Sequence, residues 1–473
     1  MKRHMLTARP SRREFVYHSG MGLGTIALSA LLQRDRARAS VLAPKPGHHA
    51  AKAKNCIFLL MEGGPSHIDT IDPKSKLADL HMTEFVKERT KFEASMNTGK
   101  RYFVRSPFEF RRAGQLGIEI NAKLRHFADC VDDVCFYRGL QATSVNHPTA
   151  LYHLNTGNRF GGDPAIGSWV TYGLGAENQN LPGFVVLPDL AYPQGGAANW
   201  SNGFLPAHYQ GTPLRPTGSP VLDMSPPEYV TETQQRETLD LLGKLNRRHM
   251  ESRPDHGELS ARIESYELAF RMQAEMPEAI NIDAEPEETR QLYGVGSEDS
   301  EVDFIGRRCL LARRLVERGV RFVQVMVSGW DSHDYIEKAH GSRLDAIDRP
   351  FAGLLKDLKR TGMLDETLVV WAGEFGRSPD NGVRGGGTAW GRDHNAPAMG
   401  FWMAGGEAPR GKIVGATDET GRNAVKVVHP IRDMHVTLLH LLGLDDAKLT
   451  YFAQGRDKQL SQTGGQLIEE LVV

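Results

Sequence analysis

The stretch Cys56-Ile-Phe-Leu-Leu-Met61, followed by Glu62-Gly-Gly-Pro-Ser-His-Ile-Asp69, decides the predicted fold. Six consecutive apolar residues are typical of a β-strand that is buried on both faces. The Gly-Gly-Pro turn stops this strand, and polar side chains follow it at once. A strand of this kind usually lies in a parallel sheet that helices cover on both faces.

Other parts of the chain extend the same pattern. Residues 304–316 and 344–358 repeat apolar side chains with a helical period, and each pattern ends near a glycine. Buried strands that alternate with amphipathic helices predict an α/β domain with a mostly parallel sheet. Residues 231–276 are charged and favour helix, so we expect a helical hairpin within an insertion of about residues 215–300. The further apolar runs lie at Val134–Leu140, Phe184–Leu187, Phe322–Val327, Leu368–Ala372 and Met399–Ala404.

Residues 1–39 have the features of a removable export signal. Arg12 and Arg13 precede an apolar run from Gly20 to Leu32, and Ala37-Arg38-Ala39 is a small-x-small cleavage pattern. The run is shorter than the roughly 20 residues that cross a bilayer, and the arginine pair resembles a twin-arginine signal. We therefore expect export to the periplasm or the cell exterior. Residues 40–54 are expected to be a linker and residues 55–473 one α/β domain without a transmembrane segment.

Charge and cysteine content narrow the classes of function. Lys+Arg 57 and Asp+Glu 58 give a net charge of −1, so no overall basic field favours nucleic acid or anionic lipid. Four cysteines without paired spacing predict buried thiols rather than a disulfide framework, with a Cys130–Cys135 bridge as the alternative. We therefore expect no nucleic-acid partner, and the sequence leaves the oligomeric state open.

Carboxylate and imidazole side chains follow the ends of the predicted strands, where α/β proteins place their functional groups. Such side chains suit a divalent cation such as zinc, manganese or calcium. Two ions could clamp both oxygens of an ester during hydrolysis. The alternatives are that Asp331 caps a helix and that Glu374 pairs with an arginine. The predicted metal ligands are Asp331, His333 and His394 at one ion, Glu374 with Asp69 or Glu62 at a second locus, and Asp393 as a ligand or as a group that orients His394.

The predicted catalytic residues are Ser66, His147, Thr149 and Arg377. His147 and Thr149 stand at the start of an expected helix, where backbone N–H groups favour an anion or a nucleophile. Arg377 would suit an oxyanion, because guanidinium binds such groups through two hydrogen bonds. The alternatives are ordinary helix capping with a packed histidine, and a solvated arginine. The sequence contains neither a P-loop nor a Gly-x-Ser-x-Gly elbow.

Several of these motifs together resemble domain-of-unknown-function family 1501, which comprises exported bacterial proteins abundant in planctomycetes. The resemblance covers almost the whole chain after the signal. The motifs that carry it are Gly63-Gly-Pro-Ser-His-Ile-Asp69, Asp72-Pro-Lys74, Gly329-Trp-Asp-Ser-His333, Gly373-Glu-Phe-Gly-Arg377, Gly391-Arg-Asp-His394 and Gly455-Arg-Asp457.

The resemblance implies a distant likeness to the alkaline phosphatase and sulfatase superfamily, whose members hydrolyse phosphate or sulfate esters with two metals. It implies an alkaline-phosphatase-like three-layer sandwich and a small-molecule or polysaccharide ester as substrate. The wider group's Ser-Asp-His-Gly is similar to the segment at Glu374, but here Phe375 stands where that group has a metal-binding histidine. The alternative function is therefore a non-catalytic protein that binds a glycan or an envelope partner.

Overall fold

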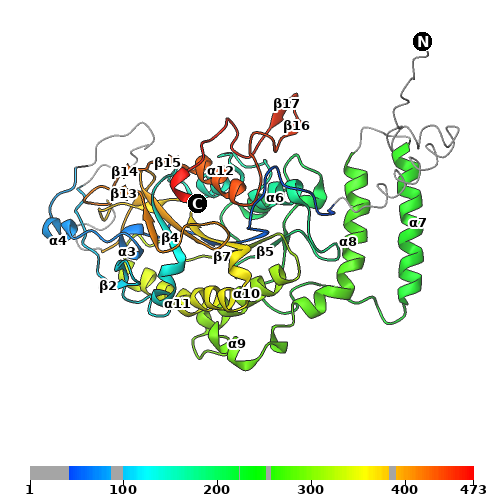
Figure 1. Ribbon diagram of the computed structural model, residues 1–473, viewed down its shortest axis with the longest axis horizontal. Coiled ribbons are helices and arrows are strands. Elements are labelled where there is room, and N and C mark those ends of the chain that lie inside the picture. The colour runs from blue at the N-terminus through cyan, green and yellow to red at the C-terminus, as the bar shows by residue number, and fades with distance from the viewer. Residues whose placement is uncertain (1–41, 87–99, 223, 252–256, 383–389, 473) are drawn as a thin grey trace, which may run out of the picture. The chain divides into compact units, whose positions relative to one another are not determined.

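The computed structural model describes residues 42–86, 100–222, 224–251, 257–382 and 390–472 (Figure 1). The predicted export signal at residues 1–39 lies outside these ranges. Residues 44–473 form one unit of the chain, and the description below concerns this unit.

The central sheet contains every apolar run that the sequence analysis identified as a strand. In the described part of the chain it has nine strands in the order β12-β4-β11-β8-β1-β7-β5-β6, with β15 paired to β4. All neighbouring strands are parallel except that β11 runs antiparallel to both β8 and β4, which confirms the mostly parallel sheet. The strands are β1 (Asn55–Met61), β4 (Val134–Gln141), β5 (Phe184–Leu187), β6 (Thr212–Pro213), β7 (Phe322–Val327), β8 (Thr367–Gly373), β11 (Met399–Ala404), β12 (Lys412–Val414) and β15 (His429–Pro430).

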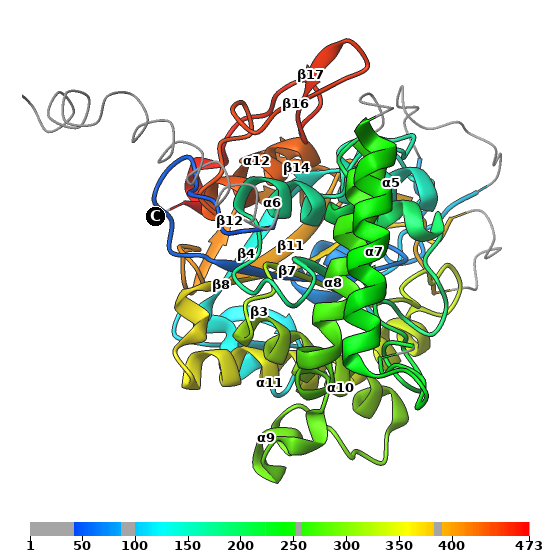
Figure 2. The ribbon, with the colours of Figure 1, turned by 90° about the vertical axis from the view of Figure 1, so that its right-hand side faces the viewer.

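Helices cover both faces of this sheet, as the continuous apolar runs require. The helices α10 (Ser300–Glu317) and α11 (Ile336–Arg360) lie on one face, and α6 (Ile166–Leu174) and α12 (Ile431–Leu441) lie on the other (Figures 1 and 2). Alternate residues of β1 point to opposite layers: Ile57 belongs to the core that α10 and α11 share, whereas Phe58 packs against Phe322. The structure is therefore a three-layer α/β/α sandwich.

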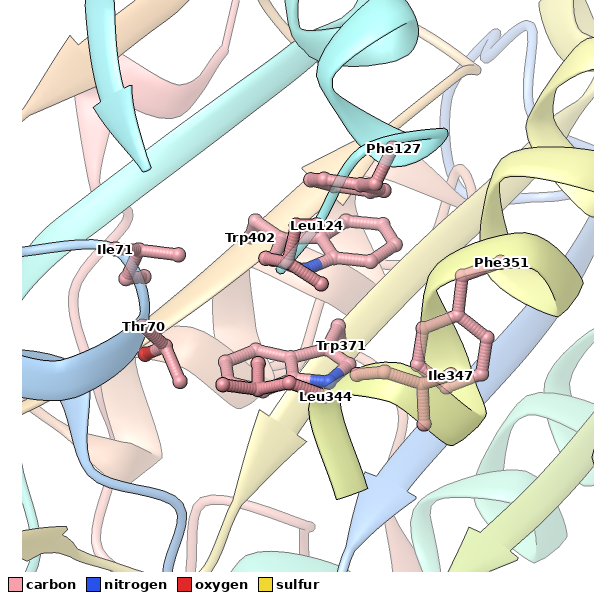
Figure 3. Close-up of a pocket in the computed structure, with 9 residues that line it drawn as sticks. All are labelled: Thr70, Ile71, Leu124, Phe127, Leu344, Ile347, Phe351, Trp371 and Trp402. Carbon is pink, nitrogen blue, oxygen red and sulfur yellow. The ribbon is translucent and has the colours of Figure 1, made fainter. Parts of the chain in front are cut away.

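Aromatic and aliphatic side chains of α11 and the sheet meet around a small cavity (Figure 3). The rings of Trp371 in β8 and Trp402 in β11 stack with centroids 6.3 Å apart, and a cavity of about 10 Å³ remains between them and Phe351. Thr70 also lines this cavity, so the short helix α3 (His67–Thr70) packs directly against the core.

Two long helices occupy part of the expected insertion. The helices α7 (Glu232–Glu251) and α8 (Gly257–Ala279) lie side by side, joined by an ion pair of 2.7 Å between Arg236 and Glu267 (Figure 1). The last turns of α8 place Met276 and Ala279 in the main hydrophobic core, where neither is exposed. The carboxyl-terminal turns of α8 therefore belong to the sheet domain.

Smaller features complete the unit. The four cysteines are buried and free, so the alternative Cys130–Cys135 bridge does not form. None of the helices in the described ranges is both long and apolar enough to cross a membrane. The remaining helices and strands are α4 (Lys76–Leu80), α5 (His147–Thr156), α9 (Glu287–Leu292), β2 (Phe110–Ala113), β3 (Ile118–Asn121), β9 (Gly376–Arg377), β10 (His394–Asn395), β13 (Ala416–Thr417), β14 (Ala424–Lys426), β16 (Tyr451–Ala453) and β17 (Arg456–Lys458).

Candidate metal centre

One edge of the sheet collects the predicted site residues. The parallel strands β1, β4, β7 and β8 all end at this edge, so the loops that follow them meet there. Because β11 is antiparallel, its beginning lies at the same edge, and His394 comes shortly before it. His394 in β10 pairs with Arg377 in β9, which ties this segment to the loop after β8.

A glycine turn after β1 lets two of these loops approach closely. Gly63 has a φ of +116°, and a Cβ atom there would lie 2.4 Å from the backbone nitrogen of Asp331. The backbone N–H of Gly63 donates to Glu374 Oε1 over 2.9 Å. Only a residue without a side chain fits between these two loops.

Three imidazoles converge on the carboxylate of Asp331. His333 Nε2 lies 3.0 Å and His394 Nε2 lies 3.2 Å from Asp331 Oδ1, and His147 Nε2 lies 3.3 Å from Asp331 Oδ2. The potential ligand atoms of His147, Asp331 and His394 all lie within 4.8 Å of one another. The structure thus brings together the predicted ligands Asp331, His333 and His394, and it adds His147, for which the sequence analysis predicted a different role. We call His147, Asp331, His333 and His394 the histidine cluster.

The other ring nitrogens of two histidines have fixed partners. His394 Nδ1 donates to the carbonyl oxygen of Val145 over 2.7 Å, because a carbonyl can only accept. His147 Nδ1 lies 2.7 Å from Glu374 Oε1, a buried carboxylate that accepts in the same way. When Nδ1 carries the proton, the lone pair of a neutral imidazole is on Nε2, and Nε2 of both rings faces Asp331.

The surroundings of the histidine cluster shift the pKa values of His147, Asp331 and His394. Burial opposes the protonation of His147, but contacts with Asp331 and Glu374 outweigh it and raise its pKa to about 9. Burial and the positive charges of Arg377, His147 and His333 lower the pKa of His394, although Asp331 opposes this. Burial also opposes ionisation of Asp331, yet the three imidazoles and Arg377 hold its pKa far below the usual range. The cluster therefore strongly favours an ionised Asp331 and resists a proton on His394.

Arg377 contacts the histidine cluster through Asp331 and the backbone around it. Its side chain is fully buried, and its guanidinium donates to Asp331 Oδ1 over 2.7 Å and to the carbonyl oxygen of Gly64 over 2.8 Å. It also donates to the carbonyl oxygens of Gly63, Trp330 and Arg392. A guanidinium without exposed surface cannot contact a substrate, so the structure gives Arg377 a positioning role in place of the predicted oxyanion clamp.

Asp69 and Ser66 belong to a different buried group. Asp69 forms an ion pair with Arg392, with Nε 2.5 Å from Oδ2 and Nη2 3.2 Å from Oδ1, and neither side chain is exposed. Ser66 Oγ donates to the same carboxylate over 2.5 Å and caps α3. The structure does not bring these two predicted site residues into the histidine cluster.

Asp393 and Thr149 lie one and two positions in the chain from members of the histidine cluster. Asp393 accepts from Arg101 Nη1 over 2.6 Å and from the backbone N–H of His394 over 2.9 Å, so it fixes the segment of His394. Thr149 is partly exposed in the first turn of α5, where its hydroxyl donates to Asn146 Oδ1 over 3.0 Å. The sequence did not identify Arg101, the partner of Asp393, because no motif around it indicates a site.

Phe375 supplies an apolar wall beside the histidine cluster. Its buried ring lies 4.5 Å from the ring of His394 and 4.9 Å from that of His147, measured between centroids. The side chain that replaces the expected second-metal histidine therefore packs against two imidazoles of the one cluster.

The fold and this edge define an α/β sandwich with a candidate metal centre at the carboxyl ends of its strands. The family described as "Protein of unknown function (DUF1501)" matches residues 53–472. The chain belongs to this family, as the motifs of the sequence indicate.

Comparison with solved structures finds distant likenesses. One is Ps i-CgsB in complex with k-i-k-neocarrahexaose, at 11% identity and a TM-score of 0.35, covering 83% of this chain and 73% of that one. Another is the PsFucS1 sulfatase from Pseudoalteromonas sp., at 11% identity and a TM-score of 0.32, covering 95% of this chain and 79% of that one. A third is the alkaline phosphatase from the Antarctic bacterium TAB5, at 9% identity and a TM-score of 0.28, covering 76% of this chain and 94% of that one. No curated protein matches the chain. Likenesses at this level carry no conclusion about the chemistry of this chain.

Proposed function

We propose that this chain is an exported hydrolase of phosphate or sulfate esters that depends on a divalent metal held by His147, Asp331 and His394. His333, whose Nε2 also faces Asp331, is the proposed fourth protein ligand. The observation that carries the proposal is geometric: Nε2 of three imidazoles converges on Asp331, while Nδ1 of two of these rings faces a carbonyl or carboxylate oxygen. A histidine that ligates a metal usually donates its other nitrogen to a carboxylate or a backbone carbonyl, and both forms occur here.

Electrostatics support a cation between these groups. Without one, the Nε2 lone pair of His394 would face an ionised carboxylate oxygen at 3.2 Å, and the two would repel each other. A proton on Nε2 would remove the repulsion, but the lowered pKa of His394 disfavours that proton. A divalent ion satisfies all of the converging atoms at once.

The surrounding residues suit a site that a substrate can reach. The side chain of Asp331 is 41% exposed, so the histidine cluster opens to solvent, while Phe375 and Arg377 close it from behind. A bound ion would polarise the ester oxygen. Of the two predicted hydroxyls only Thr149 is partly exposed, and we propose it as the nucleophile. The substrate class, a small-molecule or polysaccharide ester, and the export route rest on the sequence resemblance.

Metal analysis tests this proposal most directly. The purified chain is stripped with a chelator, reloaded with Zn²⁺, Mn²⁺ or Ca²⁺, and assayed with p-nitrophenyl phosphate and p-nitrophenyl sulfate. His394→Ala and His147→Ala should each lower metal content and hydrolysis together. His126→Ala is the matched control, because His126 is an exposed histidine far from the cluster in the chain. Metal retained by both cluster variants would overturn the proposal.

A second function is favoured by Phe375. Phe375 stands where the resemblance implies a second-metal histidine, and its ring is buried; His147, Asp331 and His394 are the single group of possible metal ligands found in the described ranges. A protein with one ion and no turnover would be a non-catalytic binder of a glycan or an envelope partner. Stoichiometric metal binding without hydrolysis of any ester would select this second function.

A further inference from the structure

The outer face of α7 carries three exposed leucine side chains. Leu241 is 58%, Leu242 is 39% and Leu245 is 54% exposed. Residues three and four positions apart lie on the same side of a helix, so these side chains form one contiguous patch. Single exposed leucines are ordinary on a protein surface, whereas a cluster of them on one helix face marks a contact surface. We call Leu241, Leu242 and Leu245 the leucine stripe.

The rest of the described chain leaves this stripe uncovered. The helix α7 packs against α8 through its opposite face, where Gly243 is buried and Arg236 pairs with Glu267 at 2.7 Å. In Figure 1 α7 stands at the outer edge of the molecule, and in Figure 2 it faces the viewer. Among the described residues, no segment buries the leucine stripe.

The charges of α7 differ between its two halves. Its first ten residues contain three acidic side chains and one arginine, and its last ten contain one acidic side chain and three lysines or arginines. Glu237 and Lys244 are both exposed, and neither forms an ion pair within the described part of the chain. They are seven positions apart, or about two helical turns, and therefore lie on the same flank of the leucine stripe.

We propose that the leucine stripe is the contact surface of a homodimer, in which α7 packs antiparallel to α7 of a second copy of this chain. A two-fold axis near the middle of the helix places the acidic half of each α7 beside the basic half of the other. Glu237 of each copy then faces Lys244 of the second copy, and the leucines pack between the two helices. A parallel arrangement would place halves of like charge side by side, so the charges select the antiparallel one. This surface is independent of the proposed metal chemistry.

Sedimentation of the purified full chain over a range of concentrations tests the proposal. Dimers should form, and Leu241→Gln should raise their dissociation constant at least about tenfold, because the symmetric contact loses two buried leucines at once. Leu241→Gln/Leu245→Gln should raise it at least about a hundredfold. A chain that stays monomeric up to about 100 µM, or a double variant that dimerises as well as the unchanged chain, would overturn the proposal.

Leu116→Gln is the matched control for these variants. Leu116 is 66% exposed in the turn between β2 and β3, and β2 lies at the other end of the molecule from α7 in Figure 1. This variant should dimerise like the unchanged chain. An equal loss of dimer in Leu116→Gln and Leu241→Gln would overturn the assignment of the contact to α7.

Exchanging the two charges tests the direction of pairing. Glu237→Lys and Lys244→Glu should each weaken the dimer about threefold to tenfold, because each places like charges opposite one another. The double variant Glu237→Lys/Lys244→Glu should recover the affinity, because the exchanged charges attract again. The helix dipole alone would instead disfavour the double variant most, since it prefers acidic residues near the first turn and basic ones near the last. A double variant that fails to recover the affinity would overturn the antiparallel arrangement.

Cross-linking adds a measurement that does not depend on removing a charge or on a glutamine variant. The four native cysteines are buried, so a cysteine introduced on the surface is the accessible thiol. Leu241→Cys, which lies near the proposed axis, should form a disulfide-linked dimer under mild oxidation at least about tenfold faster than Leu116→Cys. Equal rates for these two variants would overturn the proposal.

Discussion

Replacing Arg392 with methionine should destabilise the protein strongly, because it leaves the buried carboxylate of Asp69 without its cationic partner. Both side chains are fully buried and joined by two contacts of 2.5 and 3.2 Å. Removing one partner of a buried ion pair costs about 3–5 kcal/mol. Arg392 Nη1 also donates to the carbonyl oxygen of Val104 over 3.0 Å, and losing this bond adds about 1 kcal/mol. Methionine keeps most of the stem volume, so we expect a total loss of about 4–6 kcal/mol.

Urea unfolding followed by tryptophan fluorescence measures this loss. Arg410→Met is the matched control, because Arg410 pairs with Asp365 on the surface, and it should change the free energy of unfolding by about 1 kcal/mol or less. Asp69→Asn should also lower the free energy of unfolding, since it leaves the buried guanidinium of Arg392 without its anionic partner. The double variant Asp69→Asn/Arg392→Met should lose less than the sum of the single variants, by about 2 kcal/mol.

Two results would refute this reasoning. Equal losses in Arg392→Met and Arg410→Met would mean that the Asp69–Arg392 pair is not a buried pair. Metal analysis of Asp69→Asn provides the second check, because the structure keeps Asp69 out of the histidine cluster. A folded Asp69→Asn protein that had lost its metal would restore Asp69 as a ligand.

Three further predictions concern the turn, acid stability and export. Gly63→Ala should lower the free energy of unfolding by about 1–3 kcal/mol and weaken metal binding, because the added Cβ meets Asp331. The control is Gly162→Ala, which is also at positive φ but has nothing within 4 Å, and it should leave metal binding unchanged in the same titration. Burial, with the positive charges of nearby groups, lowers the pKa of His153 from 6.5 to about 3. The unfolded state therefore takes up this proton first, and stability falls as the pH drops from 6.5 towards 3, by up to about 1.4 kcal/mol per pH unit. His153→Gln should reduce the slope of the unfolding free energy between pH 7 and 5 by about 1 kcal/mol per pH unit on average, and an equal slope would contradict a buried neutral ring. Replacing Arg12 and Arg13 with lysine should retain the precursor in the cytoplasm, as fractionation would show, and unchanged export would exclude the twin-arginine route.

The strands and main helices could be read from the sequence, because their signals are local. Strand β1 consists of the run from Cys56 to Met61 and one preceding residue, Asn55. The runs that begin at Phe184, Phe322 and Met399 match β5, β7 and β11 residue for residue. The helical periods at 304–316 and 344–358 lie within α10 and α11. Apolar periodicity reports which side of an element is buried, and it needs no knowledge of the partner.

Local sequence signals predicted only some of the residues of the histidine cluster. Asp331, His333 and His394 stood out because polar side chains beside strand ends are unusual. His147 was noticed as well, but its position at a helix start indicated an anion site. We propose it as a metal ligand because Glu374, 227 positions away, accepts a hydrogen bond from its Nδ1, while its Nε2 faces Asp331.

The sequence by itself determined the elements of this protein and the edge of the sheet where its polar residues gather. Only the tertiary structure decided which charges meet: Asp69 pairs with Arg392, 323 positions away, and Asp331 contacts Arg377. It also decided that β11 runs antiparallel, which brings His394 to the edge where Asp331 lies. Periodicity and turn residues act over a few neighbouring positions, whereas strand direction and ion pairing depend on which distant segments pack together.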